Sequence, residues 1–168
     1  LKRKIMSNAN KNTDEVDLKQ DIFEALLEKH EVQRALCDKL EKTKGEAQRK
    51  AVYEALKLEL QAHAAAEERH LYIPVMQHDE GLDLSRHAIT EHHEMDEMME
   101  TLDDGRIGRE KWETTCADLI HKVHHHLKEE ENEFFKQAKK ILDADLQQRL
   151  GALYQVEHAE FEQTHADD

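Results

Sequence analysis

Histidine and glutamate side chains crowd residues 121–135, which read HKVHHHLKEEENEFF. These fifteen positions hold four histidines and four glutamates. Imidazole and carboxylate groups are common ligands of first-row transition metals, so the stretch could form part of a metal site. It could also be a solvated run of charge. The spacing of its residues along a helix distinguishes the two.

Helical periodicity selects one pair from this stretch. Apolar residues at steps of three and four over 112–123 predict a helix face that points into a core. The same stripe continues through His126 and Glu130. His125 and Glu129 share the four-residue spacing but lie about 100° away around the helix. We therefore expect His126 and Glu130 to be buried, and the rest of the stretch to lie mostly on the surface.

Three other apolar stripes carry the same kinds of side chain. An i, i+4 pair can converge on one ion, because its members lie about 40° apart around the axis and about 6 Å apart along it. Burying unpaired carboxylates is costly, and a pair of bound metal ions removes that cost. The stripes therefore predict six buried metal ligands: His30, His63, Glu67, His92, His126 and Glu130.

Two of these ligand pairs belong to a repeated pattern. Both His63 and His126 begin the motif H-x-x-x-E-E-x-x, which is followed by two large side chains, interpreted as apolar. The repeat indicates two copies of one half-site.

The complete pattern resembles the hemerythrin-like, or HHE cation-binding, family over residues of about 20 to 142. It consists of a lone His, H-x-x-x-E, E-H and a second H-x-x-x-E on successive helices. The resemblance implies a four-helix bundle with a non-haem di-iron centre, which holds two oxo- or hydroxo-bridged irons per chain. By position, Glu67 and Glu130 would bridge the irons, and the terminal ligands would be His30, His63, His92 and His126.

The chain departs from the classical oxygen carriers of that family at two points. Those proteins have a second histidine one turn before the third-helix ligand, where this chain has Ala88. They also end with a histidine and an aspartate five residues apart, whereas His126 and Glu130 are four apart. Candidates for a seventh ligand are Asp96, His93 and Glu68. Fewer protein ligands favour sensing, detoxification or iron handling over simple O2 carriage.

Several functions are compatible with such a centre. The leading expectation is a di-iron protein that binds O2, NO or peroxide for sensing, carriage or detoxification. The alternatives are an iron storage or delivery protein, a di-iron enzyme that turns over peroxide or NO, and a structural zinc or metal-free bundle. Whether the chain is an enzyme stays open.

Composition predicts an all-α protein, since the chain has 5 glycines and 1 proline among many good helix formers. Short linkers between long helices predict an up-down-up-down four-helix bundle with an additional C-terminal helix. The expected division is a flexible tail over 1–12, the bundle over 13–142, and a C-terminal helix and tail over 143–168. The expected helices span residues 14–43, 46–78, 83–102, 108–142 and 144–163.

Charge and cysteine content limit the partners. The net charge of −14 disfavours nucleic acid and anionic membranes. No apolar run approaches the ~18 residues of a membrane span, and no signal peptide is visible. Cys37 and Cys116 are too few for a disulfide framework and are expected to be buried. The prediction is a cytoplasmic protein. The remaining histidines expected at the surface include His70, His78, His87, His121, His124, His158 and His165.

Overall fold

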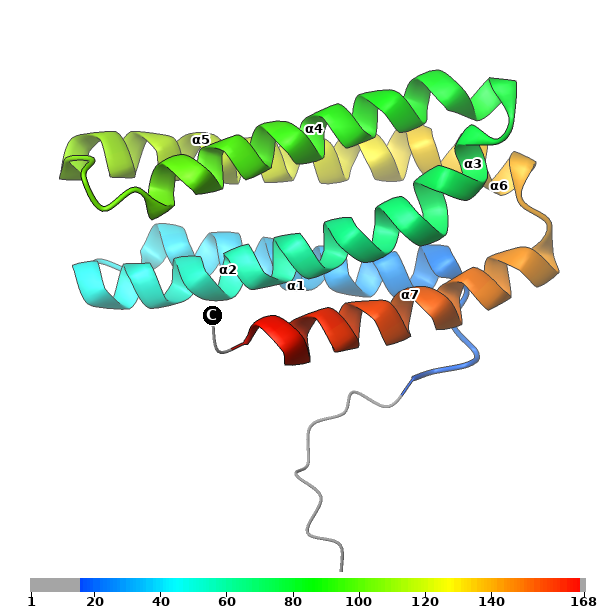
Figure 1. Ribbon diagram of the computed structural model, residues 1–168, viewed down its shortest axis with the longest axis horizontal. Helices are drawn as coiled ribbons and strands as arrows, with labels where there is room; N and C mark the ends of the chain where they lie inside the picture. The colour runs from blue at the N-terminus through cyan, green and yellow to red at the C-terminus, as the bar shows by residue number, and fades with distance from the viewer. Residues whose placement is uncertain (1–15, 167–168) are drawn as a thin grey trace, which may run out of the picture.

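The structure is a computed structural model that describes residues 16–166, and every regular element in that range is helical (Figure 1). The predicted all-α class is confirmed. The α-helices are α1 (Ile22–Lys42), α2 (Glu46–Glu67), α3 (Ile73–Met76), α4 (Asp79–Asp103), α5 (Arg109–Glu129), α6 (Phe135–Ile141) and α7 (Ala144–His165). Two short π-helices, η1 (Glu68–Tyr72) and η2 (Glu130–Phe134), join α2 to α3 and α5 to α6.

The helices form a bundle in which sequential neighbours pack together. Helix α1 contacts α2, α4 contacts α5, and α1 also contacts α5. The C-terminal helix α7 lies against α1 and α2 on the side away from α4 and α5 (Figure 1). The predicted tail over 1–12 lies outside the described residues, and the proposed domain boundaries stay predictions.

The first helix begins later than predicted. Residues 16–21 are not helical, so the prediction of helix over this segment is wrong, while residues 14 and 15 lie outside the described residues. A capping box sets the observed start. The Asp21 side chain accepts a hydrogen bond from the Glu24 backbone N–H, and the Glu24 side chain accepts one from the Asp21 backbone N–H.

The second and fourth predicted helices each contain a π-helical turn at the ligand motif. The regular part of the second ends at Glu67, and that of the fourth ends at Glu129. Pro74, which lacks an N–H, follows η1 closely, but η2 contains no proline, so proline is not required for such a turn. Beyond η1, Val75 is buried, whereas the preceding Pro74 is only partly buried.

The core consists of two hydrophobic clusters, which lie on either side of the layer formed by the six predicted ligands. One cluster includes Leu26 and Phe135, and the other includes Cys37 and Cys116, which are buried free thiols as expected. Leu27, next to the buried Leu26 on α1, is 39% exposed.

Close packing brings α7 onto the start of α1. A Cβ atom on Gly151 would lie 2.5 Å from the carbonyl oxygen of Gln20. Only a glycine allows the backbones to approach this closely at that point. The glycine thereby sets how deeply the buried face of α7 reaches into the bundle.

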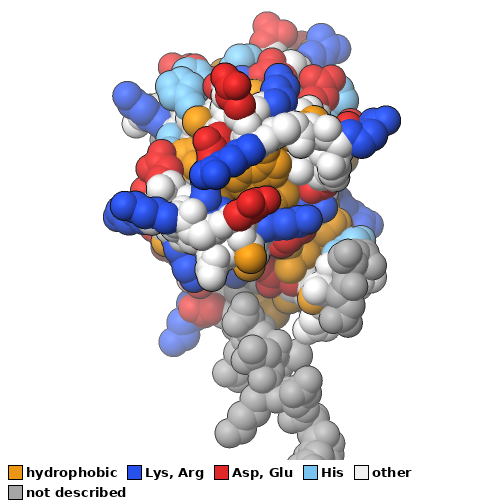
Figure 2. Space-filling view, turned by 90° about the vertical axis from the view of Figure 1, so that its left-hand side faces the viewer, with side chains coloured by type: hydrophobic (Ala, Val, Ile, Leu, Met, Phe, Trp, Pro, Cys, Tyr) orange, Lys and Arg blue, Asp and Glu red, His pale blue; other side chains and the backbone are white. Residues whose placement is uncertain are grey.

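The end of the bundle that lies away from the contact of Gly151 with α1 carries charges of both signs. Figure 2 views this end, and basic and acidic side chains are interspersed across it. None of the helices within residues 16–166 is long and apolar enough to cross a membrane.

Candidate metal centre

All six predicted ligands lie together in the interior of the bundle, and none is more than 4% exposed. Ligand atoms of His30, His63, Glu67 and Glu130 lie within 4.8 Å of one another. A second group within the same distance consists of Glu67, His92 and His126. Glu67 belongs to both groups, so the arrangement has the form of two adjacent cation positions.

The first group is built from three helical segments. His30 Nε2 on α1 lies 3.2 Å from Glu130 Oε1 on η2. His63 Nε2 lies 3.1 Å from Glu67 Oε2, one turn further along α2. Among the described residues, all four side chains keep one polar atom without a hydrogen-bond partner: His30 Nε2, His63 Nε2, Glu67 Oε1 and Glu130 Oε1. Buried polar groups are rarely left unpaired, so these atoms fit a bound cation.

The second group faces the first across the two glutamates. His92 Nε2 on α4 lies 3.1 Å from His126 Nε2 on α5 and 3.4 Å from Glu67 Oε2. His126 Nε2 lies 3.8 Å from Glu130 Oε2. Both carboxylates are therefore within reach of histidines from both groups, as bridging ligands would be.

The second glutamate in each copy of the repeated motif contacts a histidine on the opposite side of the centre, His92 or His30. Glu68 follows His63 and Glu67 in sequence, yet its Oε1 lies 2.9 Å from Nδ1 of His92. Glu131, its counterpart in the other copy, places Oε1 2.9 Å from Nδ1 of His30. Each half-site therefore orients the lone histidine of the other half, and Nε2 of that histidine is left for a metal.

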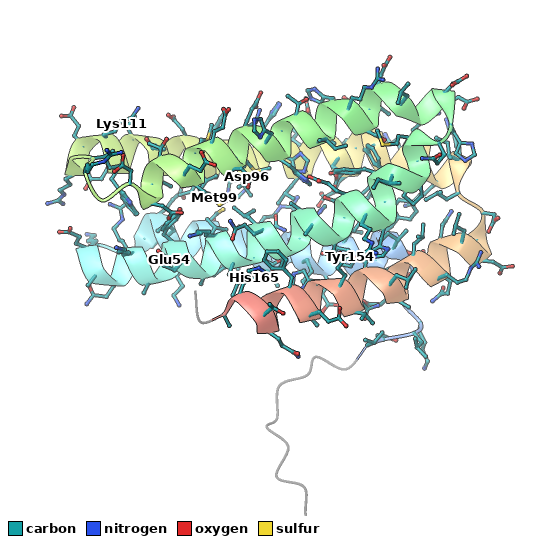
Figure 3. All side chains as sticks on the ribbon, viewed as in Figure 1. Glu54, Asp96, Met99, Lys111, Tyr154 and His165 are labelled. Carbon is teal, nitrogen blue, oxygen red and sulfur yellow. The ribbon has the colours of Figure 1, made fainter. Side chains whose placement is uncertain are left out.

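The two remaining histidines are held by different partners. Nδ1 of His63 lies 2.7 Å from the hydroxyl oxygen of Tyr154, which α7 supplies (Figure 3). Nδ1 of His126 lies 3.1 Å from Oε1 of Glu91, the residue before His92 on α4. All four imidazoles are therefore anchored through Nδ1, so that each Nε2 faces the centre.

The hydroxyl group of Tyr72 enters the centre itself. Its oxygen lies 2.9 Å from Glu67 Oε2, contacts Glu130 Oε2, and lies 3.5 Å from His92 Nε2. Tyr72 was interpreted from sequence as a large apolar residue, which missed this contact. A phenol has only one hydrogen to donate, so it cannot satisfy both carboxylates at once.

The two halves differ at the position of this tyrosine. Tyr72 lies nine residues after His63, and its counterpart nine residues after His126 is Phe135. Tyr72 packs against His92, whereas Phe135 stacks on His30 with ring centroids 5.8 Å apart. The cation position next to His92 therefore has a phenolic hydroxyl beside it, and the position next to His30 has an apolar ring.

The buried carboxylates of the centre favour positive charge beside them. Burial alone lowers the pKa of His30, but Glu130 and Glu131 outweigh it and raise this pKa to about 9. Burial likewise opposes protonation of His92, but Glu67 and Glu68 raise its pKa to about 10. Burial raises the pKa of the Glu67 carboxyl, but His63 and His92 hold it well below its ordinary value.

The three candidates for a seventh ligand do not join either group. His93 is exposed, with its Nε2 3.4 Å from Glu97, and Asp96 is also exposed (Figure 3). Glu68 contacts Nδ1 of His92 rather than the centre. None of these three residues therefore brings a ligand atom to the centre.

A small cavity adjoins the centre at the position where the classical carriers have their additional histidine. It has a volume of about 20 Å³ and is lined by Ala88, Glu91, His126, Glu130 and Phe134 together with neighbouring side chains at its edge. This volume suffices for about one molecule of the size of water. The short side chain of Ala88 leaves this space beside two predicted ligands.

Surface expectations were met for most of the other polar residues. His125 and Glu129 form an ion pair, Nε2 to Oε1 at 3.2 Å, with exposed or half-buried side chains. His78, His87, His121 and His165 are exposed, and His70 and His124 are half-buried. The prediction for His158 was wrong: it is 2% exposed, because α7 turns it toward Glu59 on α2.

The structure thus defines a helical bundle with a buried histidine–glutamate centre of the cation-binding type. Residues 21–138 match the family model of the hemerythrin HHE cation binding domain, and the chain belongs to this family. Comparison with curated proteins found no match. Comparison with solved structures found none either.

Proposed function

We propose that this chain is a non-haem di-iron protein that binds O2, NO or peroxide, with its four long helical segments in an up-down-up-down arrangement. The observation that carries the proposal is the orientation of the four histidines. Each is anchored through Nδ1 and directs Nε2 toward Glu67 or Glu130. Membership of a cation-binding family supports the same conclusion.

The two groups of ligands suggest how two ions would be held. His30 and His63 would bind one ion, His92 and His126 would bind the other, and Glu67 and Glu130 would bridge them. Nitrogen and oxygen donors of this kind suit iron. When bound, a pair of irons supplies electrons and open coordination positions for a small ligand.

The surroundings of His92 and His126 favour this side of the centre for the small ligand. The cavity beside Ala88 reaches His126 and Glu130, and the hydroxyl of Tyr72 lies within hydrogen-bond distance of Glu67 and His92. The hydroxyl could donate a hydrogen bond to an anionic ligand.

Metal analysis combined with absorption spectroscopy tests the proposal. We expect about two irons per chain and an absorption band that responds to azide or NO. Substituting His63→Gln or Glu130→Gln should reduce iron occupancy. His125→Gln and Glu129→Gln are matched controls with the same spacing on the same helical segment, and they should leave occupancy unchanged.

Other outcomes distinguish the alternatives. Repeated turnover of peroxide or NO with a reductant would identify an enzyme, while iron that moves readily to an acceptor would indicate storage or delivery. Protein that binds no iron, or loses none in the His63 and Glu130 variants, would contradict the proposal.

A further inference from the structure

Helix α7 carries a further H-x-x-x-E pair. His158 and Glu162 have the same spacing as His63–Glu67 and His126–Glu130, although the sequence pattern placed His158 on the surface. In the structure, this pair faces Glu59 on α2, one helical turn before His63. One ligand atom from each of Glu59, His158 and Glu162 lies within 4.8 Å of the other two.

The contacts within this cluster leave a buried carboxylate oxygen without a partner. His158 Nε2 lies 3.0 Å from Glu59 Oε2, and His158 Nδ1 lies 3.8 Å from Glu162 Oε2. Glu59 is 3% exposed, and its Oε1 has no hydrogen-bond partner among the described residues. A buried carboxylate is usually paired at both oxygens or binds a cation.

The cluster combines an ionised carboxylate with nearby cationic side chains. Burial raises the pKa of the Glu59 carboxyl, but the contact with His158 outweighs burial. The net pKa therefore lies below its ordinary value, and Glu59 is ionised. Burial raises the pKa of the Glu162 carboxyl, although His158 and Lys29 on α1 act to lower it, and Lys29 also lowers that of Glu59. Two carboxylates and one imidazole form a donor set that suits divalent first-row cations such as Mn²⁺, Fe²⁺ and Zn²⁺.

We propose that Glu59, His158 and Glu162 form a third, mononuclear site for a divalent first-row cation, separate from the centre held by the six interior ligands. Its outer side is open, because the side chain of Glu162 is 32% exposed. Its inner side adjoins the centre, because Glu59 precedes His63 by one turn and His158 follows Tyr154, the partner of His63, by one turn. A cation bound there is one helical turn, about 6 Å along the axis, from the level of His63.

Manganese binding to the full chain tests this site. Equilibrium dialysis, with electron paramagnetic resonance of free Mn²⁺, should give three equivalents for the parent protein. His158→Gln and Glu162→Gln should each remove one equivalent. The two equivalents of Mn²⁺ that remain belong to the interior centre, so adding His63→Gln should reduce them.

Control variants separate this site from nonspecific surface binding. His93→Gln alters another H-x-x-x-E pair, His93–Glu97, whose side chains are 73% and 66% exposed, and it should leave three equivalents. Lys29→Ala removes a competing positive charge and should tighten the third equivalent. Glu162 is partly exposed, so its variant remains informative even if His158→Gln folds poorly.

Two results would overturn the third site. One is that Glu162→Gln does not bind one equivalent of Mn²⁺ fewer than the parent protein. The other is loss of the same equivalent in His93→Gln. Neither result depends on the interior centre, because the comparison is the difference of one equivalent between parent and variant. Failure of the di-iron proposal would instead appear as no response to His63→Gln.

Discussion

The hydroxyl oxygen of Tyr154 on α7 lies 2.7 Å from Nδ1 of His63 on α2, and both side chains are buried. Helix α7 lies outside the 21–138 segment that matches the family model. The C-terminal helix therefore does more than cover the bundle. It supplies the group that orients one of the predicted ligands.

Removing this hydroxyl should weaken metal binding while preserving the packing of α7. We expect Tyr154→Phe to lower metal affinity by about 10- to 100-fold, the usual effect of losing a group that orients a ligand. Competition with a chelator would measure the change. Tyr53→Phe is the matched control, since this buried hydroxyl bonds to Asp103 in the other core cluster. An equal loss in both variants would refute the orienting role.

Removing the hydroxyl of Tyr72 should act on the small ligand rather than on the metals. All six predicted ligands remain in Tyr72→Phe, so we expect about two irons per chain as before. Loss of a hydrogen bond to a charged ligand costs about 1.5 kcal/mol or more, which corresponds to about tenfold weaker azide binding. Spectroscopic titration with azide would measure it. Unchanged azide affinity would place the ligand elsewhere.

Filling the cavity beside Ala88 should hinder ligand binding. Ala88→Val adds two methyl groups next to a space of about 20 Å³, so we expect weaker azide or NO binding and a destabilisation of about 1–3 kcal/mol from overpacking. Ala55→Val is a control on the exposed face of α2. Azide titration and thermal unfolding of both variants would measure the two effects. Normal ligand affinity in Ala88→Val would rule out this cavity as the binding position.

The metal-free protein should lose stability in alkaline solution. The pKa values of His30 and His92 are raised from 6.5 to about 9 and about 10 in the folded state. Their contribution to stability is therefore complete below pH 6.5 and is lost as the pH rises through 9 to 10. We expect the melting temperature of metal-free protein to fall between pH 7 and 10.

The metal-loaded protein provides the comparison for this pH dependence. Bound metal requires neutral imidazoles, so the loaded protein should not show the loss that protonated His30 and His92 cause. Parallel melting curves of both forms across the same pH range would measure the difference. The same decline in both forms would show that other groups cause it.

A larger residue at Gly151 should move α7 away from α1. The new Cβ in Gly151→Ala would meet the backbone of Gln20 and Asp21 at 2.5–2.6 Å. We expect a destabilisation of about 1–3 kcal/mol, together with weaker metal binding because Tyr154 shifts from His63. Denaturant unfolding and chelator competition would measure the two effects. Ala152→Ser, on a less buried position of α7, is the control.

Much of the fold, and the burial of the six candidate ligands, could be predicted from local periodicity. Helical spacing distinguishes His126 from His125, because a difference of one residue rotates a side chain by about 100°. The structure buries the first and leaves the second exposed. A small cavity lies beside Ala88, where the sequence pattern lacks the second histidine of the classical carriers.

The sequence by itself determined which helix faces are apolar and which polar residues those faces bury, since both follow from spacing along one helix. Only the tertiary structure decided which residues meet across helices. It paired Glu68 with His92, Tyr154 with His63, and His158 with Glu59. The physical reason is that these contacts depend on how helices distant in sequence are set against one another, and on π turns that alter the register of the chain. Periodicity within one helix carries no information about either.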